Sequence, residues 1–408
     1  MKIGIPSETD RLLKVIVHTP GREVSLVNPT LKEELLFDDI IFEEDARQEH
    51  LDMLKIFAAA MPENGEILEI TDLALACFQS ENVRTKFIEL MIKQLPYENI
   101  HTVKAELIQQ SPENLLKFAV EGSIGLKHTF NLQPAPNLLF TRDLAAMAGN
   151  RIILSRAAKK ARAREFLLME TIVKHHPLFE PVKNNIIHIG GHQSIEGGDV
   201  LVASEKIVLI GMSERTSFSG LMSVAKQLLE SDIEHVLAVD IPKQRSSMHL
   251  DTIFTFSDEN ECVVFPPAIE EQTENVVDLF RSDGKLQAIQ RHSLKNTLEE
   301  LTGNNFNFIR CGGKERINQY REQWTDGANV FALAPGVIVG YGRNARTFEA
   351  LVENNYRHMT QFEFIEEFAD KSFDPSKEGK IAISFQGHEL CRGRGGARCM
   401  TLPISRIK

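Results

Sequence analysis

A recurring unit of apolar and polar positions runs through most of the chain. Each copy begins with an Asp or Asn and continues through a short apolar run, a polar turn and a strongly β-forming run, before a helical pattern. Four copies begin at Asp143, Asp199, Asp251 and Asn329, and a fifth, partial match begins near Asp10. Polar turns of this kind fit hairpins, and the β-forming runs fit strands buried on both faces. The unit therefore predicts a hairpin followed by a helix.

The repetition of this unit suggests a ring of α/β modules around a central axis. The polar residue at the start of each hairpin would then point toward one shared centre. Chance recurrence of hairpins in an ordinary α/β protein is the alternative. In the four copies the β-forming runs are residues 152–154, 207–210, 262–265 and 337–339. The helical patterns that follow them are residues 162–168, 220–229, 269–280 and 348–353. The strand of the partial match is 15–17.

Residues 71–132 follow a different pattern, which predicts a helical insertion. Val83, Phe87, Leu90, Met91 and Leu95 mark one helix face, and Ser111 before a proline is typical of a helix start. We therefore expect a catalytic α/β domain formed by residues 1–70 and 133–408, with an inserted helical subdomain at 71–132. A second polar stretch, 360–379, is interpreted as a surface excursion.

Composition narrows the classes of function. The chain has 408 residues, 42% of them hydrophobic, and a formal net charge of −11. Nucleic acids and anionic membranes require a basic surface, so the charge argues against both as partners and is compatible with a small cationic substrate. No stretch approaches the ~20 apolar residues that span a bilayer, and the first residues lack the apolar core of a secretion signal. The five scattered cysteines contain no CxxC pair, which indicates a reducing, cytoplasmic setting.

Unusual polar content accompanies the apolar strands in five short segments. Asp143, Asp199 and Asp251 occupy equivalent positions in the repeat, whereas the sequence alone does not place the segment that contains Cys399. If that segment joins the others, the site holds a thiol, an imidazole, carboxylates and guanidiniums, which suit thiol attack with acid/base help. The five segments are 136–143, 195–199, 211–217, 248–251 and 393–399.

Cys399 is the favoured nucleophile among the cysteines. Three glycines and two arginines lie within the six residues before it, which gives backbone access and a positive field that favours thiolate. A lone cysteine is more often a small buried hydrophobe. Cys391 shares the arginine-rich setting and is the rival nucleophile, while Cys77, Cys262 and Cys311 are interpreted as structural.

A zinc site is the alternative interpretation of the histidines. His188, His192 and Glu196 have the spacing that would converge on a metal from one helix. The glycine pair between them and the apolar run before them favour strand and loop instead. His249 and Asp251, two residues apart, would share one strand face. The glycines after Cys391 lack the spacing of a dinucleotide-binding loop.

Seven segments, in this order along nearly the whole chain, resemble the arginine deiminase family. This family belongs to the guanidine-modifying superfamily and is built as a five-bladed, pseudo-symmetric α/β propeller of ββαβ-type modules. The segments are ELLFDD (34–39), FTRD (140–143), EGGD (196–199), GMSERTS (211–217), MHLDT (248–252), REQW (321–324) and RGRGGARCM (392–400).

The resemblance implies that free L-arginine is hydrolysed to L-citrulline and ammonia through a covalent S-alkylthiouronium intermediate on Cys399, without metal or cofactor. It also implies a homo-oligomer. His249 would be the general acid/base, with Glu196 as its partner, while Asp143 and Asp251 would grip the guanidinium. The remaining implied roles are Arg162, Arg215 and Asn137 on the substrate carboxylate, Arg394 near that carboxylate and the thiol, Leu36 in a lid-like loop, Phe140 in the pocket wall and Asp199 as support.

Some features depart from the family pattern. The 360–379 stretch is longer than expected, Cys391 and His388 are atypical, and Gly342 stands where an Asp is expected before Arg343. A sister amidinotransferase or methylated-arginine hydrolase would share the same thiol, imidazole and carboxylates. A non-catalytic propeller that binds a partner, such as a ribosome anti-association factor, is the rival from another class.

Overall fold

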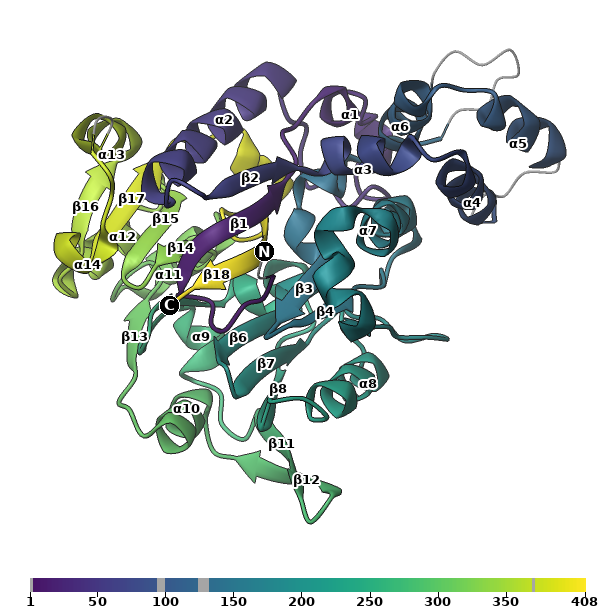
Figure 1. Ribbon diagram of the computed structural model, residues 1–408. Coiled ribbons are helices and arrows are strands. Elements are labelled where there is room, and N and C mark those ends of the chain that lie inside the picture. The colour runs from purple at the N-terminus through teal and green to yellow at the C-terminus, as the bar shows by residue number, and fades with distance from the viewer. Residues whose placement is uncertain (1–2, 94–99, 124–131, 369–370) are drawn as a thin grey trace.

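A computed structural model describes residues 3–93, 100–123, 132–368 and 371–408 of the protein. The described residues form five small sheets (Figure 1). In each sheet the first two strands pair antiparallel, and a third strand pairs parallel to the second after a helical crossover. Consecutive sheets contact one another, and the fifth sheet contacts the first through β14 and β1. The five units therefore close into a ring, and the predicted propeller of ββαβ modules is confirmed.

The blades are as follows. Blade 1 contains β18 (Thr401–Ile407), β1 (Arg11–Val17), α2 (Glu43–Ala60) and β2 (Glu66–Glu69). Blade 2 contains β3 (Ala145–Ala148), β4 (Arg151–Leu154), α7 (Ala163–His175) and β5 (Ile186–Ile187). Blade 3 contains β6 (Val200–Ser204), β7 (Ile207–Met212), α8 (Phe218–Leu228) and β8 (His235–Asp240). Blade 4 contains β9 (Phe254–Asp258), β10 (Glu261–Val264), α9 (Pro266–Ile269), α10 (Leu294–Thr302) and β13 (Asn307–Arg310). Blade 5 contains β14 (Phe331–Ala334), β15 (Val337–Tyr341), α12 (Ala345–Glu353) and β17 (Ile381–Phe385).

The remaining helices and strands join or extend these blades. β11 (Val276–Ser282) and β12 (Lys285–Arg291) extend the sheet of blade 3, and β16 (Arg357–Thr360) extends that of blade 5. The other helices are α1 (Arg22–Ser25), α3 (Ile70–Phe78), α4 (Glu81–Ile92), α5 (Ile100–Ile108), α6 (Pro112–Glu121), α11 (Arg316–Trp324), α13 (Gln361–Phe368) and α14 (Pro375–Glu378). Among the helices in the described ranges, none has both the length and the apolar character needed to cross a bilayer.

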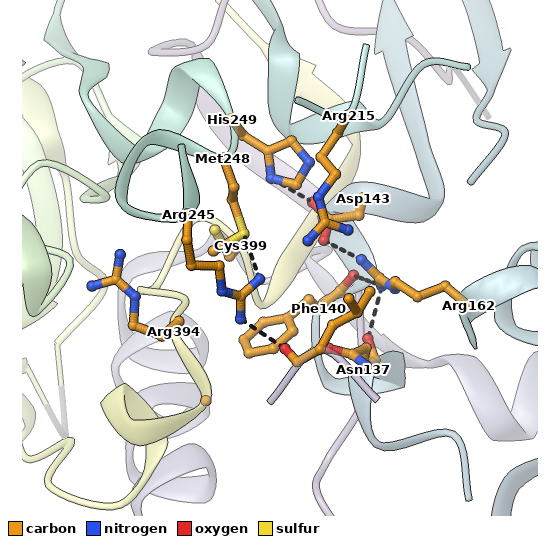
Figure 2. A pocket seen from close by; sticks show the side chains of 12 residues that line it. Asn137, Phe140, Asp143, Arg162, Arg215, Arg245, Met248, His249, Arg394 and Cys399 are labelled. Atoms are coloured by element: carbon orange, nitrogen blue, oxygen red, sulfur yellow. Dashed lines mark hydrogen bonds and ion pairs between the residues drawn. The ribbon is translucent and has the colours of Figure 1, made fainter. Parts of the chain in front are cut away.

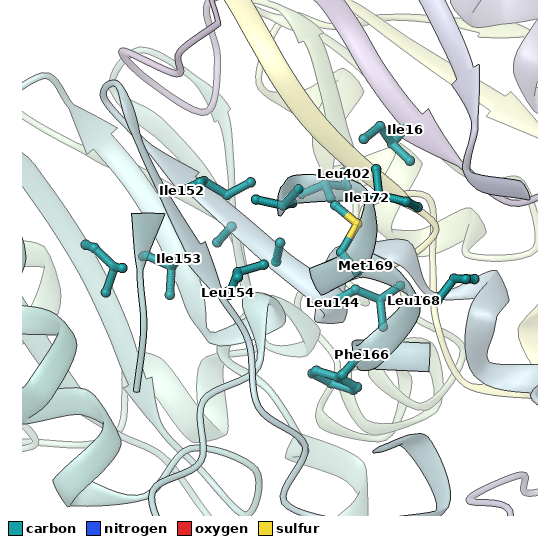
Figure 3. Close-up of a cluster of buried hydrophobic side chains, with 14 of the residues drawn as sticks. Ile16, Leu144, Ile152, Ile153, Leu154, Phe166, Leu168, Met169, Ile172 and Leu402 are labelled. Atoms are coloured by element: carbon teal, nitrogen blue, oxygen red, sulfur yellow. The ribbon is translucent and has the colours of Figure 1, made fainter. Parts of the chain in front are cut away.

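The second strand of each blade is the β-forming run that the sequence pattern singled out. These strands are buried along almost their whole length because one face meets the crossover helix and the other faces the ring. Figure 3 shows one resulting cluster, in which Ile16 and Leu402 of blade 1 lie with Ile152 and the α7 residues Met169 and Ile172. Each fully buried aliphatic side chain of this kind contributes about 1.5–3 kcal/mol to stability. Blades 1 and 2 therefore share a core.

The helix predicted at 269–280 is wrong. The short α9 already ends at Ile269, and residues 276–280 belong to β11, which pairs with β8 of the neighbouring blade. Pairing with an existing sheet edge satisfies the backbone of this segment better than an isolated helix would. The crossover helix of blade 4 is α10, whose first turn is capped by the Ser293 hydroxyl.

Four helices, α3 to α6, occupy the segment predicted as a helical insertion. Ser111 caps α6 as expected, by accepting from the Asn114 amide. The predicted helix face is only partly right, because Leu90 is exposed and the buried face also includes Ile88; Leu95 lies outside the described residues. α3 and α4 pack on α7, and their apolar side chains join the core cluster of blade 2. The division at residues 71 and 132 stays a prediction.

The interpretation of 360–379 as a surface excursion is wrong in part. Phe364, Phe368 and Phe373 are buried and contact one another. They belong to the core cluster that also contains residues of α2, and α13 packs on that helix. The sequence pattern did not indicate this packing, because charged side chains outnumber the three phenylalanines whose burial determines the position of the stretch.

Candidate active site

The short turn before the first strand of each blade supplies the polar side chains of the site. Asp143, Asp199 and Asp251 lie in such turns before β3, β6 and β9, and the turns of blades 2, 3 and 4 contact one another in sequence order. Asn329 lies at the same point before β14, and Cys399 lies just before β18. Equivalent positions of the repeat therefore meet at the centre of the ring.

One narrow cavity collects most of the residues singled out in the sequence. Its free volume is about 20 Å³, which is room for little more than a water molecule. Figure 2 shows the guanidinium of Arg245 and the side chain of Met248 beside Cys399, in the middle of the group. Glu196 and Asp251 lie immediately behind the lining and have no solvent exposure. The lining residues are Leu36, Asn137, Phe140, Asp143, Arg162, Arg215, Arg245, Met248, His249, Gly393, Arg394 and Cys399.

His249 is held between two carboxylates. Its Nε2 lies 2.9 Å from Oε2 of Glu196, and its Nδ1 lies 3.6 Å from Oδ1 of Asp143. Burial lowers the pKa of His249, but the carboxylates of Asp143, Glu196 and Asp199 more than offset that effect and raise the pKa to about 9. Burial alone would raise the pKa of Glu196, but His249 and the cations of Arg215 and Arg162 lower it. The pair therefore rests as imidazolium and carboxylate near neutral pH.

The thiol of Cys399 lies against the second carboxylate. Its Sγ is 3.7 Å from Oδ2 and 3.9 Å from Oδ1 of Asp251. The amide side chain of Asn329 bridges both residues, since its Oδ1 accepts from the Cys399 amide and its Nδ2 donates to the Asp251 carbonyl. Burial raises the pKa of the Cys399 thiol well above its usual range, and the nearby aspartates add to this effect. These surroundings favour the protonated form of the sulfur.

Asp251 is fixed from behind by a buried ion-pair network. Arg398 donates from Nη1 to Oδ2 of Asp251 at 2.7 Å and from Nη2 to Oε1 of Glu8 at 2.9 Å. Burial raises the pKa of Glu8, but Arg398 and Arg142 outweigh burial and lower it to about 2. The network ties the first residues of the chain to a carboxylate beside the thiol.

Arg162 forms an ion pair with Asp143, the carboxylate that was expected to bind the guanidinium of the substrate. Its Nη1 donates to Oδ2 of Asp143, and its Nε donates to Oε2 of Glu165 at 2.7 Å. Its Nη2 donates to the carbonyl of Asn137 at 2.9 Å. Arg215 is less engaged: its Nη1 is 4.0 Å from Oε1 of Glu196, and its Nε has no hydrogen-bond partner among the described residues. Arg215 is therefore the cation that a carboxylate can reach with least rearrangement.

The loop that carries Leu36 covers the cavity. Leu36 adopts a left-handed backbone with φ of 64°, which costs a branched residue energy. Arg245 holds this loop by donating from Nη2 to the Leu36 carbonyl at 2.7 Å and from Nε to Asp38 at 3.2 Å. The side-chain amide of Asn137 donates to the Leu35 carbonyl at 2.6 Å. The cavity is thus closed by contacts between this loop and the cavity walls.

Asp199 lies outside the cavity lining and orders the segments around it. Its Oδ2 accepts from the hydroxyls of Ser213 and Thr216, both at 2.6 Å, and its Oδ1 accepts from the Leu250 amide at 2.9 Å. Burial raises the pKa of Asp199 to about 6, against the lowering effect of His249 and the hydroxyls. It therefore joins the strand end of blade 3 to the residue after His249.

The residues of the alternative zinc interpretation do not come together. His188 and His192 are exposed in a loop, whereas Glu196 is fully buried against His249. A different trio, Asp143, Glu196 and His249, offers ligand atoms within 4.8 Å of one another. Arg162 already places a guanidinium on Asp143 there, so these residues fit an organic cation better than a metal ion.

Cys391 is buried but lies outside the residues that line the cavity. Its sulfur contacts a guanidinium nitrogen of Arg343 and the carbonyl of His388. Burial raises its pKa, and Arg343 opposes the rise. The two cysteines of the arginine-rich segment therefore face different environments.

Sequence reasoning missed several residues of the site. Asn329 carried a signal, because it begins the fourth copy of the repeat. Arg245 and Met248 directly precede His249 and could have been found by extending that segment. Arg398 stands in the segment 393–399, but its ion pairs with Glu8 and Asp251 carried no signal, because those partners lie far away in sequence.

Solved structures with the same fold are enzymes that act on guanidines. The dimethylarginine dimethylaminohydrolase of Pseudomonas aeruginosa, complexed with citrulline, superposes with a TM-score of 0.52 at 14% identity, covering 96% of this chain and 99% of that one. The N-terminal domain of ArgZ, a cyanobacterial arginine dihydrolase, has a TM-score of 0.53 at 15% identity, covering 97% of this chain and 98% of that one. At these identities the likeness concerns the fold alone.

Sequence comparison is more specific. The family model described as arginine deiminase matches residues 90–406. The arginine deiminases of Listeria monocytogenes and Treponema denticola are each 33% identical to the chain, with 99% of this chain and 98% of the relative covered. The arginine deiminase of Bacillus cereus is 34% identical, with the same coverage. The chain belongs to the arginine deiminase family.

Proposed function

We propose that the protein hydrolyses free L-arginine to L-citrulline and ammonia, with Cys399 as the nucleophile. Family membership supports the reaction. The observation that carries the assignment of residues is that a thiol, an imidazolium and a carboxylate (Cys399, His249 and Asp143) line one closed cavity. The expected inventory for thiol attack on a cation is therefore in one place.

The first half of the reaction is attack on the guanidinium carbon. Asp143 and Asp251 orient the planar cation by charge-assisted hydrogen bonds, which places its carbon near the sulfur. The Cys399 thiol first loses its proton to bulk water as the substrate cation binds. The thiolate then forms a bond to that carbon, the C–N bond breaks, and His249 donates its proton to the departing nitrogen. Ammonia leaves, and an S-alkylthiouronium remains on the enzyme.

The second half is hydrolysis of this intermediate. His249, now neutral, removes a proton from a water molecule that attacks the same carbon. The C–S bond then breaks, which gives citrulline and restores the sulfur. Each proton transfer of this kind contributes about 10²–10⁴-fold to the rate.

The charges around the sulfur suit a substrate that brings its own cation. Burial and the nearby aspartates raise the pKa of the Cys399 thiol, and a bound guanidinium offsets the negative field of the aspartates. The guanidinium of Arg162 on Asp143 must give way to that of the substrate, which is an exchange between like groups. The substrate thereby activates the nucleophile that attacks it.

The test of this proposal is citrulline formation from arginine alone, with a chelator present. Mass spectrometry of acid-quenched enzyme should find the adduct on the peptide that contains Cys399. Product that forms only after addition of an acceptor amine would indicate an amidinotransferase instead. Ribosome co-sedimentation without ammonia release would indicate a non-catalytic propeller.

The pH dependence of kcat/KM should report on His249. The imidazolium form is the acid in the first step, so the rate is expected to fall as pH rises through about 9, the pKa of this residue. Replacing Glu196 with glutamine removes a carboxylate that raises this pKa, while burial still lowers it. The alkaline limb should therefore move to lower pH in Glu196→Gln. A limb that stays in place would mean that another group titrates there.

Arg215 is expected to act in substrate binding. Arg215→Ala should raise KM for arginine by about 10–100-fold, because a charge-assisted hydrogen bond contributes about 1.5–3 kcal/mol, and kcat should change much less. Arg281, an arginine on β11 paired with Glu230, provides the control, since Arg281→Ala should leave KM unchanged. An unchanged KM in Arg215→Ala would remove this residue from the carboxylate site.

Two further features of the protein are proposed here. A reducing, cytoplasmic setting is supported by the five cysteines, all of which are free and buried within the described residues. A homo-oligomer is supported by Ile317, Tyr320 and Trp324, which leave a large apolar surface exposed on α11. Light scattering measures the mass in solution directly.

A further inference from the structure

The last turn of α11 touches two parts of the candidate site without lining the cavity. Gln323 is buried, and its side-chain Nε2 donates to the carbonyl of Ser246 at 2.5 Å and to that of Thr252 at 3.3 Å. These two carbonyls flank the short segment that carries His249 and Asp251. The side-chain amide of one α11 residue therefore bonds to both ends of that segment.

The next residue, Trp324, holds Arg394. The guanidinium carbon of Arg394 lies 3.9 Å from the centroid of the indole ring, and its Nη1 donates to the Trp324 carbonyl. Nη2 of Arg394 lies 3.5 Å from the Ser246 carbonyl, which also accepts from Gln323. Two consecutive residues of α11 thus fix the His249 segment and Arg394 relative to each other.

The turn is itself anchored to the next helix. Glu322 accepts from the backbone amides of Arg346 and Thr347, both at 2.8 Å, and from the Thr347 hydroxyl at 2.7 Å. This carboxylate caps the start of α12, which lies in blade 5. Three adjacent residues of the REQW segment, Glu322, Gln323 and Trp324, thus contact three different parts of the protein. The proposed mechanism assigns no role to this segment.

We infer that Gln323 is a positioning residue for the reaction, acting through His249 and Asp251, and that Trp324 positions Arg394. The inference rests on the proposed function of this site. The turn at 249–252 is held internally, because the Thr252 hydroxyl and amide both bond to the His249 carbonyl. Asp199 and Asn329 hold its middle, at the Leu250 amide and the Asp251 carbonyl, and Gln323 holds its outer ends. Displacement of a reacting group by about 1 Å can cost about 10²-fold in rate.

Gln319 on the same helix offers a matched control. It is also buried, and its Nε2 donates to the Gly313 carbonyl at 2.9 Å, away from the cavity. Gln323→Met removes two amide–carbonyl bonds and Gln319→Met removes one, both at nearly constant volume. Both variants should therefore lower the melting temperature, Gln323→Met by somewhat more.

The two variants should differ in kinetics. In Gln323→Met, kcat is expected to fall about 10–100-fold with little change in KM, and the alkaline limb of the pH profile should shift as His249 moves relative to its carboxylates. Gln319→Met should keep the wild-type kcat and pH profile. Trp324→Leu should instead raise KM for arginine, through Arg394. Equal, small losses of kcat in both glutamine variants, with no shift of the pH limb, would overturn the inference.

If Gln323→Met does not fold, Gln323→Glu answers the same question. The glutamate has the size of glutamine, but when ionised it cannot donate to the two carbonyls. It should reproduce the loss of kcat, and wild-type kinetics in this variant would overturn the inference. A wild-type enzyme that makes no citrulline would refute the proposed function itself, whereas an active wild type with unaffected Gln323 variants would refute only the positioning role.

Discussion

Replacing Cys399 with serine is expected to lower kcat for citrulline formation by at least about 10⁴-fold, because loss of a nucleophile removes the covalent route altogether. The hydroxyl has nearly the same size, so the buried bonds from the Cys399 amide to Asn329 and from Asn329 to Asp251 should persist. The melting temperature should therefore stay close to that of the wild type. A citrulline assay with an unfolding measurement on the same sample separates the two effects.

Cys391→Ser is the matched control for this experiment. This second cysteine lies eight residues earlier in the arginine-rich segment, and its sulfur contacts Arg343 rather than the cavity. The variant should keep citrulline production within a few-fold of the wild type. If activity instead survived in Cys399→Ser and disappeared in Cys391→Ser, the nucleophile would have to be reassigned.

Replacing Asp143 with asparagine is expected to reduce kcat/KM by about 10²–10³-fold. The neutral amide cannot balance the guanidinium of the substrate, and it also removes a carboxylate that raises the pKa of His249. The same change breaks a buried ion pair with Arg162, which on its own costs about 3–5 kcal/mol of stability. Activity must therefore be compared at a temperature where the variant is fully folded.

Glu165→Gln isolates the part of the effect that comes from Arg162. Glu165 is buried and pairs with Nε of the same guanidinium at 2.7 Å, but it does not line the cavity. This variant should be destabilised to a similar degree and keep much more of its activity. Equal losses of activity in the two variants would mean that Asp143 matters by holding Arg162 and not by gripping the substrate.

Much of the fold could be predicted because blades 2 to 5 each encode their own hairpin. The runs at 152–154, 207–210 and 337–339 are apolar enough to be buried on both faces, and the polar residue before each hairpin marks the inner end of a blade. The segment 269–280 failed because its apolar spacing fits a short helix as well as a strand. Only the free edge of β8, which is not visible locally, decides in favour of β11.

Some residues of the site could likewise be recognised in the sequence, and others could not. Asp143, Glu196, His249 and Cys399 stand in segments whose polar residues interrupt apolar runs, so they were visible as candidates. The contacts of Gln323, Glu8 and Arg245 were not, because each reaches a partner far away in sequence, as Glu8 does with Arg398 across 390 positions. Such pairs depend on how the blades close, and closure follows from the packing of the whole ring.

The pairing of β18 with β1 has a consequence for how the enzyme comes into being on the ribosome. Synthesis runs from the N-terminus, and domains begin to fold as they emerge. Cys399 and the strand that follows it are synthesised after the other strands of the five blades, and that strand completes the sheet begun by residues 11–17. The acids and the imidazole of the site are therefore present in the polypeptide before the sulfur that lies with them at the centre of the ring. On the proposed mechanism, catalytic competence and closure of the ring arrive together.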